Sequence, residues 1–188
     1  MMNRRMFLTV SASGLAGLVL WRYGRRQPTH AAAVPGGPAK MVTIVEFSDA
    51  GKRLKVESVS KIVKSDDEWR KQLSPAAFEI TRRAGTEPAF TGEYWNLHEQ
   101  GIFRCVCCDT ALFSSKTKFE SGTGWPSFWE PIAKENVEEI ADSSFGMMRV
   151  AVSCRRCDAH LGHVFDDGPK PTGLRYCMNS AALKFVNS

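Results

Sequence analysis

The stretch 105–108, Cys-Val-Cys-Cys, governs how this 188-residue chain is held together, because the stretch 154–157, Cys-Arg-Arg-Cys, repeats its Cys-x-x-Cys spacing. Such a spacing lets one tight turn bring two thiolates to the same side. Two turns of this kind complete a tetrahedral shell of sulfur with no open position, and thiolate suits the borderline-soft zinc ion. The sequence therefore predicts one structural Zn²⁺ per chain. The predicted ligands are Cys105, Cys108, Cys154 and Cys157.

Two other uses of these four cysteines stay open. Disulfides suit an exported protein, although a bond inside Cys-x-x-Cys closes only a very small loop and stabilises little. A redox pair is the second alternative, but two copies without a βαβ pattern argue against it. Cys107 is surplus to the four ligands, and we interpret it as a spectator in the first turn.

The positive charge of the chain is concentrated at its start. The formal net charge is +5, and residues 1–33 contain arginine at positions 4, 5, 22, 25 and 26 but no acidic residue. Without these five, 25 − 5 = 20 basic residues balance the 20 acidic ones. The rest of the chain therefore has no excess of positive charge with which to bind nucleic acid, and no nucleic-acid partner is expected.

Residues 1–33 have the pattern of an export signal. Twin arginines, Arg4 and Arg5, precede a weakly hydrophobic stretch that is shorter than the roughly 20 residues of a membrane-spanning helix. The pattern resembles a Tat-type signal, and the alanines at 31–33 offer a cleavage site. The protein is therefore expected to be exported and periplasmic, or anchored on the periplasmic side. The basic cluster at 22–26 leaves cleavage and anchoring open, with membrane contact expected only through residues 1–26.

The remaining chain reads as an extension over 34–64 followed by one domain over 65–188. A Pro- and Gly-rich linker leads into two β-branched runs, 42–47 and 54–59, with Ser-Asp-Ala-Gly between them. This pattern is typical of a β-hairpin.

Helix signals follow the hairpin. Ser65 and Glu68 form a capping box, and Ser74 with Pro75 begins a second helix that Gly85 ends near residue 84. After residue 100 the pattern is of short β segments, at 103–106, 147–153, 162–165 and 182–186. Two helices followed by many strands predict a mainly β (α+β) fold: antiparallel sheets with a short N-terminal helical cover and the four-cysteine zinc site.

Cys177 stands apart from both cysteine pairs, between Arg175 and Asn179. A nearby cation and hydrogen-bond donors favour thiolate, which is the reactive form of cysteine. An inert, buried cysteine in a strand is the alternative. His160 and His163 precede it and favour a reactive role, because histidine exchanges protons near neutral pH. Two structural histidines, or a second metal site, remain alternatives for this pair.

A glycine-framed turn over 122–129, Gly-Thr-Gly-Trp-Pro-Ser-Phe-Trp, brings three aromatic residues together. Aromatic side chains in such a turn can line a small apolar pocket, so Trp125 and Phe128 are candidate substrate contacts. Core packing is the alternative. We favour core packing for Trp129 and lean toward it for Phe128.

Together these motifs resemble the B-type methionine sulfoxide reductases, and the resemblance covers about residues 65–186. The matching segments are 82–87, both Cys-x-x-Cys pairs, 124–128 (Gly-Trp-Pro-Ser-Phe), 160–165 (His-Leu-Gly-His-Val-Phe), 167–169 (Asp-Gly-Pro) and 175–185 (from Arg-Tyr-Cys to Phe). Several motifs in one order make this a specific signal.

The resemblance implies thiol-dependent reduction of methionine-R-sulfoxide, free or protein-bound, in which Cys177 attacks sulfur and becomes a sulfenic acid. His163 would then protonate the departing oxygen, and His160 would hold that oxygen. Arg175 would favour the thiolate, Asn179 would orient the site, and Asp167 would steer a histidine. Trp125 would contact the S-methyl group of the substrate, with Phe128 as a second substrate contact.

The sequence departs from the family pattern at Thr123, where many relatives have a recycling cysteine. A thioredoxin-like or other external thiol is therefore the expected reductant, with Cys107 the internal alternative. Two other classes stay open. A non-enzymatic zinc-knuckle module would not need Cys177, His163 and Trp125 together, and a thiol–disulfide oxidoreductase would need a Cys-x-x-Cys free of zinc.

Overall fold

The computed structural model describes residues 40–143 and 149–188. The predicted export signal and nearly all of the predicted linker lie outside these residues. In the described part of the chain, no helix is both long and apolar enough to cross a membrane. The predicted mainly β fold with two short helices and a four-cysteine cluster is confirmed.

The β-strands of the described residues form three antiparallel sheets, of two, six and three strands. The two-stranded sheet pairs β1 (Met41–Phe47) with β2 (Arg53–Ser60). The six-stranded sheet has the order β5 (Lys118–Phe119), β6 (Ser127–Phe128), β10 (Arg175–Met178), β9 (His160–Phe165), β8 (Arg149–Cys154), β7 (Val137–Asp142). The three-stranded sheet has the order β11 (Leu183–Asn187), β3 (Gly101–Cys105), β4 (Ala111–Ser114). Short 3₁₀ turns lie at η1 (Ser115–Thr117), η2 (Lys134–Asn136) and η4 (Ser180–Ala182).

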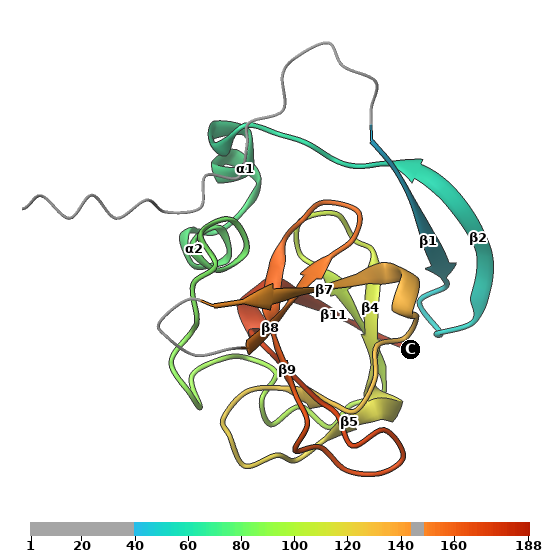
Figure 1. Cartoon of the computed structure of the whole chain (residues 1–188), viewed down its shortest axis with the longest axis vertical. Coiled ribbons are helices and arrows are strands. Elements are labelled where there is room, and N and C mark those ends of the chain that lie inside the picture. Colours follow the sequence, from blue (N-terminus) through green and yellow to red (C-terminus); the bar gives the residue numbers. More distant parts are fainter. Residues whose placement is uncertain (1–39, 144–148) are drawn as a thin grey trace, which may run out of the picture. The chain divides into compact units, whose positions relative to one another are not determined.

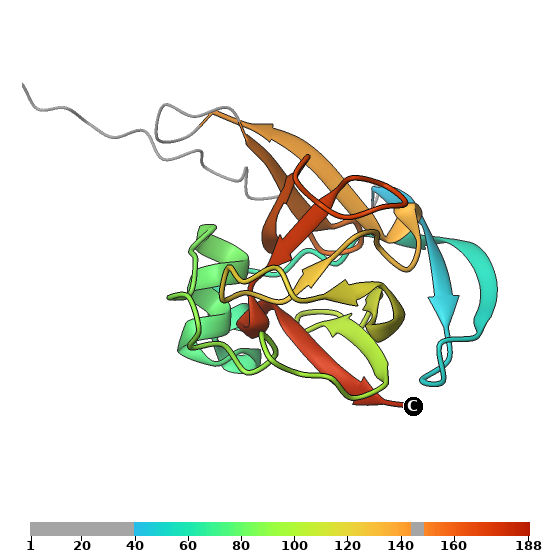
Figure 2. The ribbon, with the colours of Figure 1, turned by 90° about the horizontal axis from the view of Figure 1, so that it is seen from below.

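The predicted hairpin is present as β1 and β2, and the buried side chain of Asn136 helps to fix it to the domain. Asn136 accepts a 2.7 Å hydrogen bond from the Val45 amide and donates one of 2.8 Å to the Val45 carbonyl. It also donates a 2.7 Å bond to the Ala111 carbonyl in β4. Figures 1 and 2 show this hairpin on the side of the β domain away from the helices.

Both helices begin at the residues that the sequence indicated. Helix α1 (Asp66–Gln72) has Ser65 at its N-cap with the full capping box, and α2 (Pro75–Arg83) has Ser74 at its N-cap and proline in its first turn. The second helix ends as Ala84 takes a left-handed conformation and the Gly85 amide bonds to the Glu79 carbonyl at 3.1 Å. The left-handed residue that ends the helix is therefore Ala84, one residue before the predicted glycine.

The core lies between the sheets and beneath the helices, and aromatic rings fill much of it. The Phe113 and Phe128 rings stack with centroids 4.5 Å apart, and Phe103 meets Phe128 edge-on at 5.0 Å. Helix α2 packs against β9 and η4, and η4 directly follows β10. This packing sets the surroundings of the short strand that contains Cys177.

Candidate active site and metal centre

Cys177 lies in β10, at the centre of the six-stranded sheet. It pairs directly with His163 of β9 on one side and with Ser127 of β6 on the other. Side chains of directly opposed residues project from the same face of a sheet. Strand register therefore places a half-buried thiol, an imidazole and a hydroxyl on one face.

A small hydroxyl network borders the thiol. Thr123 Oγ1 lies 3.9 Å from Cys177 Sγ, and Ser121 Oγ lies 2.8 Å from Thr123 Oγ1 and 2.7 Å from Ser127 Oγ. The residue in place of the usual recycling cysteine is thus the direct neighbour of Cys177. A threonine hydroxyl at this point can hydrogen-bond to sulfur but cannot form a disulfide.

The pKa of Cys177 is raised in this setting, chiefly because burial penalises the thiolate. Thr123, Arg175 and Ser127 each lower that pKa, but together they do not offset burial. Arg175 thus acts on the pKa in the predicted direction, toward thiolate, but burial outweighs it and favours the protonated thiol.

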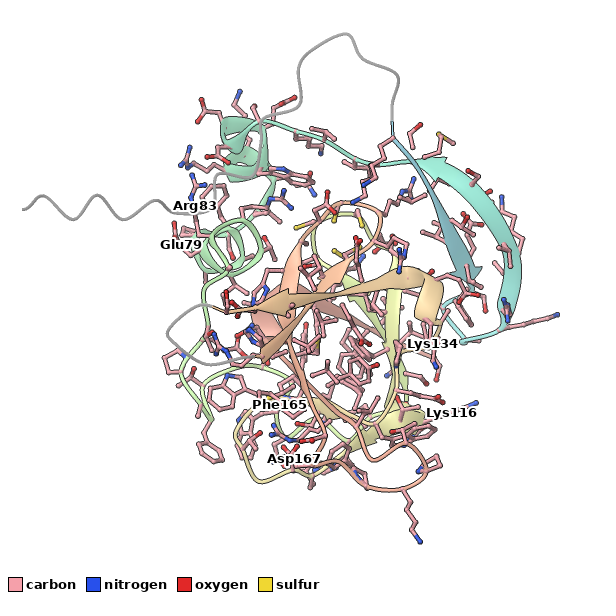
Figure 3. All side chains as sticks on the ribbon, in the orientation of Figure 1. Glu79, Arg83, Lys116, Lys134, Phe165 and Asp167 are labelled. Carbon is pink, nitrogen blue, oxygen red and sulfur yellow. The ribbon has the colours of Figure 1, made fainter. Side chains whose placement is uncertain are left out.

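Arg175 is engaged by an acidic neighbour. Its Nε and one terminal nitrogen each donate a 2.8 Å hydrogen bond to Asp167, in a bidentate pair. This pairing raises the pKa of Arg175 and lowers that of Asp167. Figure 3 labels Asp167 just beyond the end of β9, close to Phe165, over whose ring the Arg175 guanidinium lies at 4.4 Å. The prediction that Asp167 steers a histidine is wrong, because its carboxylate is committed to Arg175.

We expect Asp167→Asn to lower the pKa of Cys177, since the Arg175 charge would no longer be offset by a carboxylate. The lower pKa would give more thiolate at pH 7 than in the parent. The measurement is the rate of iodoacetamide reaction with Cys177 from pH 6 to 10, read by mass spectrometry. The parent rate should still be rising above pH 8.5, the ordinary cysteine pKa, and the variant profile should shift to lower pH.

Asp166→Asn, at an exposed neighbour, is the matched control. Superimposable profiles would refute the coupling.

The carboxylate that steers a histidine is Asp142. Its Oδ2 lies 2.9 Å from His163 Nε2 and 3.1 Å from an Arg149 terminal nitrogen. Asp142 ends β7 opposite Arg149 in β8, and β8 in turn pairs with β9. Asp142 was not among the predicted site residues, because strand order, rather than any local motif, connects it to His163.

A bulge brings His160 and His163 to the same region, although three residues in a regular strand would point them to opposite faces. Val152 pairs with Gly162 but Ser153 pairs with His160, so Leu161 is the extra residue. The two imidazole rings lie 5.3 Å apart, edge to face. Glycine is required at 162, because a Cβ there would lie 2.1 Å from the Cys177 carbonyl oxygen.

Trp125 and Phe128, both predicted to contact substrate, lie in different environments in the structure. Trp125 is half-buried, and its indole nitrogen donates a 3.0 Å hydrogen bond to the Glu87 carbonyl. Phe128 is 0% exposed and stacks on Phe113. The prediction that Phe128 contacts substrate is therefore corrected: its ring belongs to the core, while Trp125 is free to border a site.

Asn179 follows Cys177 by two residues and is 3% exposed. Its amide nitrogen donates a 3.1 Å bond to the Leu161 carbonyl, and its side-chain oxygen accepts a 3.0 Å bond from the Glu87 backbone amide. Asn179 thus ties the end of β10 to the histidine bulge, a placement suited to orienting the site.

The four cysteines predicted as ligands come together, and their sulfur atoms all lie within 4.8 Å of one another. The group could hold one metal ion. Cys105 Sγ lies 3.7 Å from Cys157 Sγ, and Cys108 Sγ lies 3.5 Å from Cys154 Sγ. None of the four forms a disulfide.

The two cysteine turns have the same backbone design. Asp109 and Asp158 each adopt a left-handed conformation just after a pair, at φ 61° and 56°. Each donates a 2.9 Å backbone bond to the first cysteine of its pair, Cys105 and Cys154. One turn connects strands of the three-stranded sheet and the other connects strands of the six-stranded sheet. A metal here would join the two sheets.

Cys107 lies inside the first turn but outside the group of four. Its side chain is 4% exposed and belongs to the core, and its carbonyl accepts a 2.7 Å bond from Gln72. This burial is what a spectator residue would show.

Fold and site thus define a β protein whose two larger sheets meet at four clustered cysteines that could hold a metal ion, with a separate, half-buried cysteine in the six-stranded sheet. The model of the SelR domain matches residues 73–187, and the chain belongs to this family. It is similar to proteins named peptide methionine sulfoxide reductase MsrB. The relative from Thioalkalivibrio sulfidiphilus is 58% identical over 121 residues, covering 64% of this chain and 88% of that protein. Those from Acinetobacter baylyi and Herminiimonas arsenicoxydans are 56% and 55% identical, covering 67% and 66% of this chain and 91% of each protein.

Proposed function

We infer that this protein is a peptide-methionine (R)-S-oxide reductase, an oxidoreductase that returns methionine-R-sulfoxide to methionine. The observation that carries the inference is the placement of Cys177 beside His163, across paired strands, in a chain more than 50% identical to MsrB proteins. A non-enzymatic module with the same metal centre would have no use for this pairing.

The first step of the proposed reaction uses one thiol, that of Cys177. The sulfur of Cys177 attacks the sulfoxide sulfur, the S–O bond breaks, and oxygen passes to cysteine. Thiol and sulfoxide thus become sulfenic acid and methionine, with the thiol proton retained on the oxygen. Two external thiols then reduce the sulfenic acid, releasing water and one disulfide. Because the resting thiol is protonated, attack on the sulfoxide has to be coupled to loss of that proton.

We propose that His163 handles this proton, since it is opposite Cys177 and its ring is held by Asp142 at 2.9 Å. His160, 5.3 Å from His163 ring to ring, is placed to hold the sulfoxide oxygen. Trp125 would receive the S-methyl group, and Asn179 would keep the histidine strand and β10 in register. Strand pairing with Cys177 supports the role of His163, whereas the roles of His160 and Trp125 are those that the family resemblance implies.

Turnover of separated R and S epimers with a dithiol reductant tests the function directly. The parent protein should reduce the R epimer of a methionine-sulfoxide peptide and leave the S epimer unchanged. Reduction of the S epimer alone, or of neither, would refute the proposed activity.

We propose that an external thiol, such as a thioredoxin-like carrier, reduces the Cys177 sulfenic acid directly. Thr123 occupies the neighbouring position and cannot supply a thiol, and Cys107 is buried in a fixed turn. One equivalent of sulfoxide without reductant should leave Cys177 as an adduct of a sulfenic-acid trap. Thr123→Cys should instead yield an internal disulfide, because it puts sulfur where an oxygen lies 3.9 Å from Cys177 Sγ. A Cys107–Cys177 disulfide formed by the parent at turnover rate would contradict direct reduction.

We propose that the four-cysteine group holds zinc in a structural role. A Zn–S length of about 2.3 Å gives sulfur–sulfur separations of about 3.8 Å in a regular tetrahedron, and the two pairs at 3.7 and 3.5 Å fit this. The donor set is all thiolate, with no open position for substrate. The ion would keep the two cysteine turns together, while Cys177 and its neighbours act on substrate.

We also propose that the chain is exported, on the pattern of Arg4 and Arg5 before a weakly hydrophobic stretch. In a bacterial host with a twin-arginine translocase, the parent should fractionate with the periplasm or its membrane face. Changing both arginines to lysine should retain the protein in the cytosol. Equal distribution of the two proteins would contradict a twin-arginine signal.

A further inference from the structure

Glu87 lies outside the residues assigned so far, in the irregular segment between α2 and β3. Its side chain is half-buried and faces the end of β10. Three of its groups make four hydrogen bonds, and all four go to residues at or beside the Cys177 site. We propose that Glu87 is a positioning residue for sulfoxide reduction, which holds Trp125 and Asn179 in place relative to Cys177. This proposal rests on the proposed function.

The carboxylate fixes the turn that follows Cys177. Its two oxygens accept bonds from the backbone amides of Ser180 at 2.6 Å and Ala181 at 3.0 Å. These amides begin η4, where no earlier carbonyl within the turn is available to accept from them. Hydrogen bonds to an ionised acceptor are about twice as strong as neutral ones. The negative charge therefore holds η4 and the Glu87 segment together.

The backbone of Glu87 then reaches the two site residues. Its amide donates to Asn179 Oδ1 at 3.0 Å, and its carbonyl accepts from Trp125 Nε1 at 3.0 Å. One peptide segment thus sets the amide plane of Asn179 and the direction of the Trp125 indole ring. The carboxylate keeps that segment where both bonds can form.

Close packing around the carboxylate supports a fixed position. A Cβ on Gly92 would lie 2.4 Å from Glu87 Oε1 and 2.3 Å from Ser180 Oγ, so there is no room for a side chain there. The Ser180 hydroxyl itself accepts a 3.1 Å bond from the Tyr94 amide. The segment 87–94 and the start of η4 therefore interlock.

Glu87→Gln tests the carboxylate with almost no change of shape. The glutamine amide has one oxygen, so its NH₂ group would face a backbone N–H, and one bond would be replaced by two opposed donors. The backbone bonds to Trp125 and Asn179 would remain possible but would lose their support. Small misplacement of reacting groups can cost up to about a hundredfold in rate. We expect kcat/KM for an R-sulfoxide peptide to fall by about ten- to a hundredfold, mainly through kcat.

Three further readouts separate positioning from a general structural role. The reaction of Cys177 with iodoacetamide should change less than threefold, because the thiol environment is retained. The fluorescence of Trp125, obtained as the difference from Trp125→Phe, should shift as the indole loses its aligned acceptor. The losses caused by Glu87→Gln and Trp125→Phe should be less than additive in the double variant, since both affect one positioned ring. Glu93→Gln, at an exposed carboxylate in the same segment, is the control and should match the parent.

The outcomes are distinct. An active parent with a folded Glu87→Gln protein of parental kcat/KM would overturn the inference and leave the proposed function standing. Full additivity with Trp125→Phe would also overturn it. Failure of Glu87→Gln to fold would assign the carboxylate to stability and refute positioning. An inactive parent would instead refute the proposed function.

Discussion

Cys177→Ser is expected to abolish sulfoxide reduction, with a loss of at least about 10³-fold in kcat, as for other nucleophile deletions. A serine hydroxyl stays protonated at neutral pH and cannot take up the sulfoxide oxygen in the same reversible way. The fold should persist, because Cys177 is half-buried and lies apart from the four-cysteine group. The melting temperature should therefore stay within about 4 °C of the parent. The measurement is R-epimer turnover with a dithiol, together with a thermal melt.

Cys107→Ser is the matched control, since it makes the same chemical change at a cysteine outside the four ligands. Activity per folded molecule should equal that of the parent. Residual turnover near the parental level in Cys177→Ser would remove Cys177 from the reaction. The same loss in Cys107→Ser would show that the first cysteine turn takes part in catalysis.

Cys105→Ser and Cys157→Ser are each expected to release the metal and unfold the domain. Both side chains are 1% exposed, and they lie in turns of two different sheets. Structural zinc contributes on the order of 10 kcal/mol of folding free energy in small peptides, whereas a whole domain is stable by only about 5–15 kcal/mol. Three remaining thiolates would also repel one another without the ion. Elemental analysis and a chemical melt measure the two effects.

Cys107→Ser again provides the control within the same turn, and it should retain one metal ion per chain. Cys177→Ser should retain it as well. A purified parent protein without stoichiometric zinc, yet with a cooperative melt, would refute the structural role. Retention of zinc by Cys157→Ser would show that the ligand set is wrong.

Features that depend on a few adjacent residues could be predicted from the sequence. Ser65 with Glu68 and Ser74 with Pro75 determined where the helices begin, because a capping bond spans only three residues. The two Cys-x-x-Cys pairs likewise predicted a converging group of four, since each turn fixes its own two sulfurs. Cys177 could be singled out as the cysteine left over beside an arginine and an asparagine.

Features that depend on strand pairing and burial required the tertiary structure. The bulge at Leu161 puts His160 and His163 on one face, and strand order gives His163 its partner Asp142. No spacing in the sequence encodes either of these. Likewise, Glu87 meets the end of β10 across more than 90 residues of chain.

Electrostatics and exposure at the site were also decided by packing. Arg175 favours thiolate at Cys177, as the sequence predicted, but burial raises the pKa of the thiol and Asp167 pairs with the arginine. Phe128 was a candidate substrate contact that leaned toward core packing, and its stacking on Phe113 places it in the core. The sequence by itself determined which cysteines converge and singled out Cys177, because short-range geometry and spacing carry that information. Only the tertiary structure decided which charges and rings face the thiol, because desolvation and pairing depend on residues that come from every part of the chain.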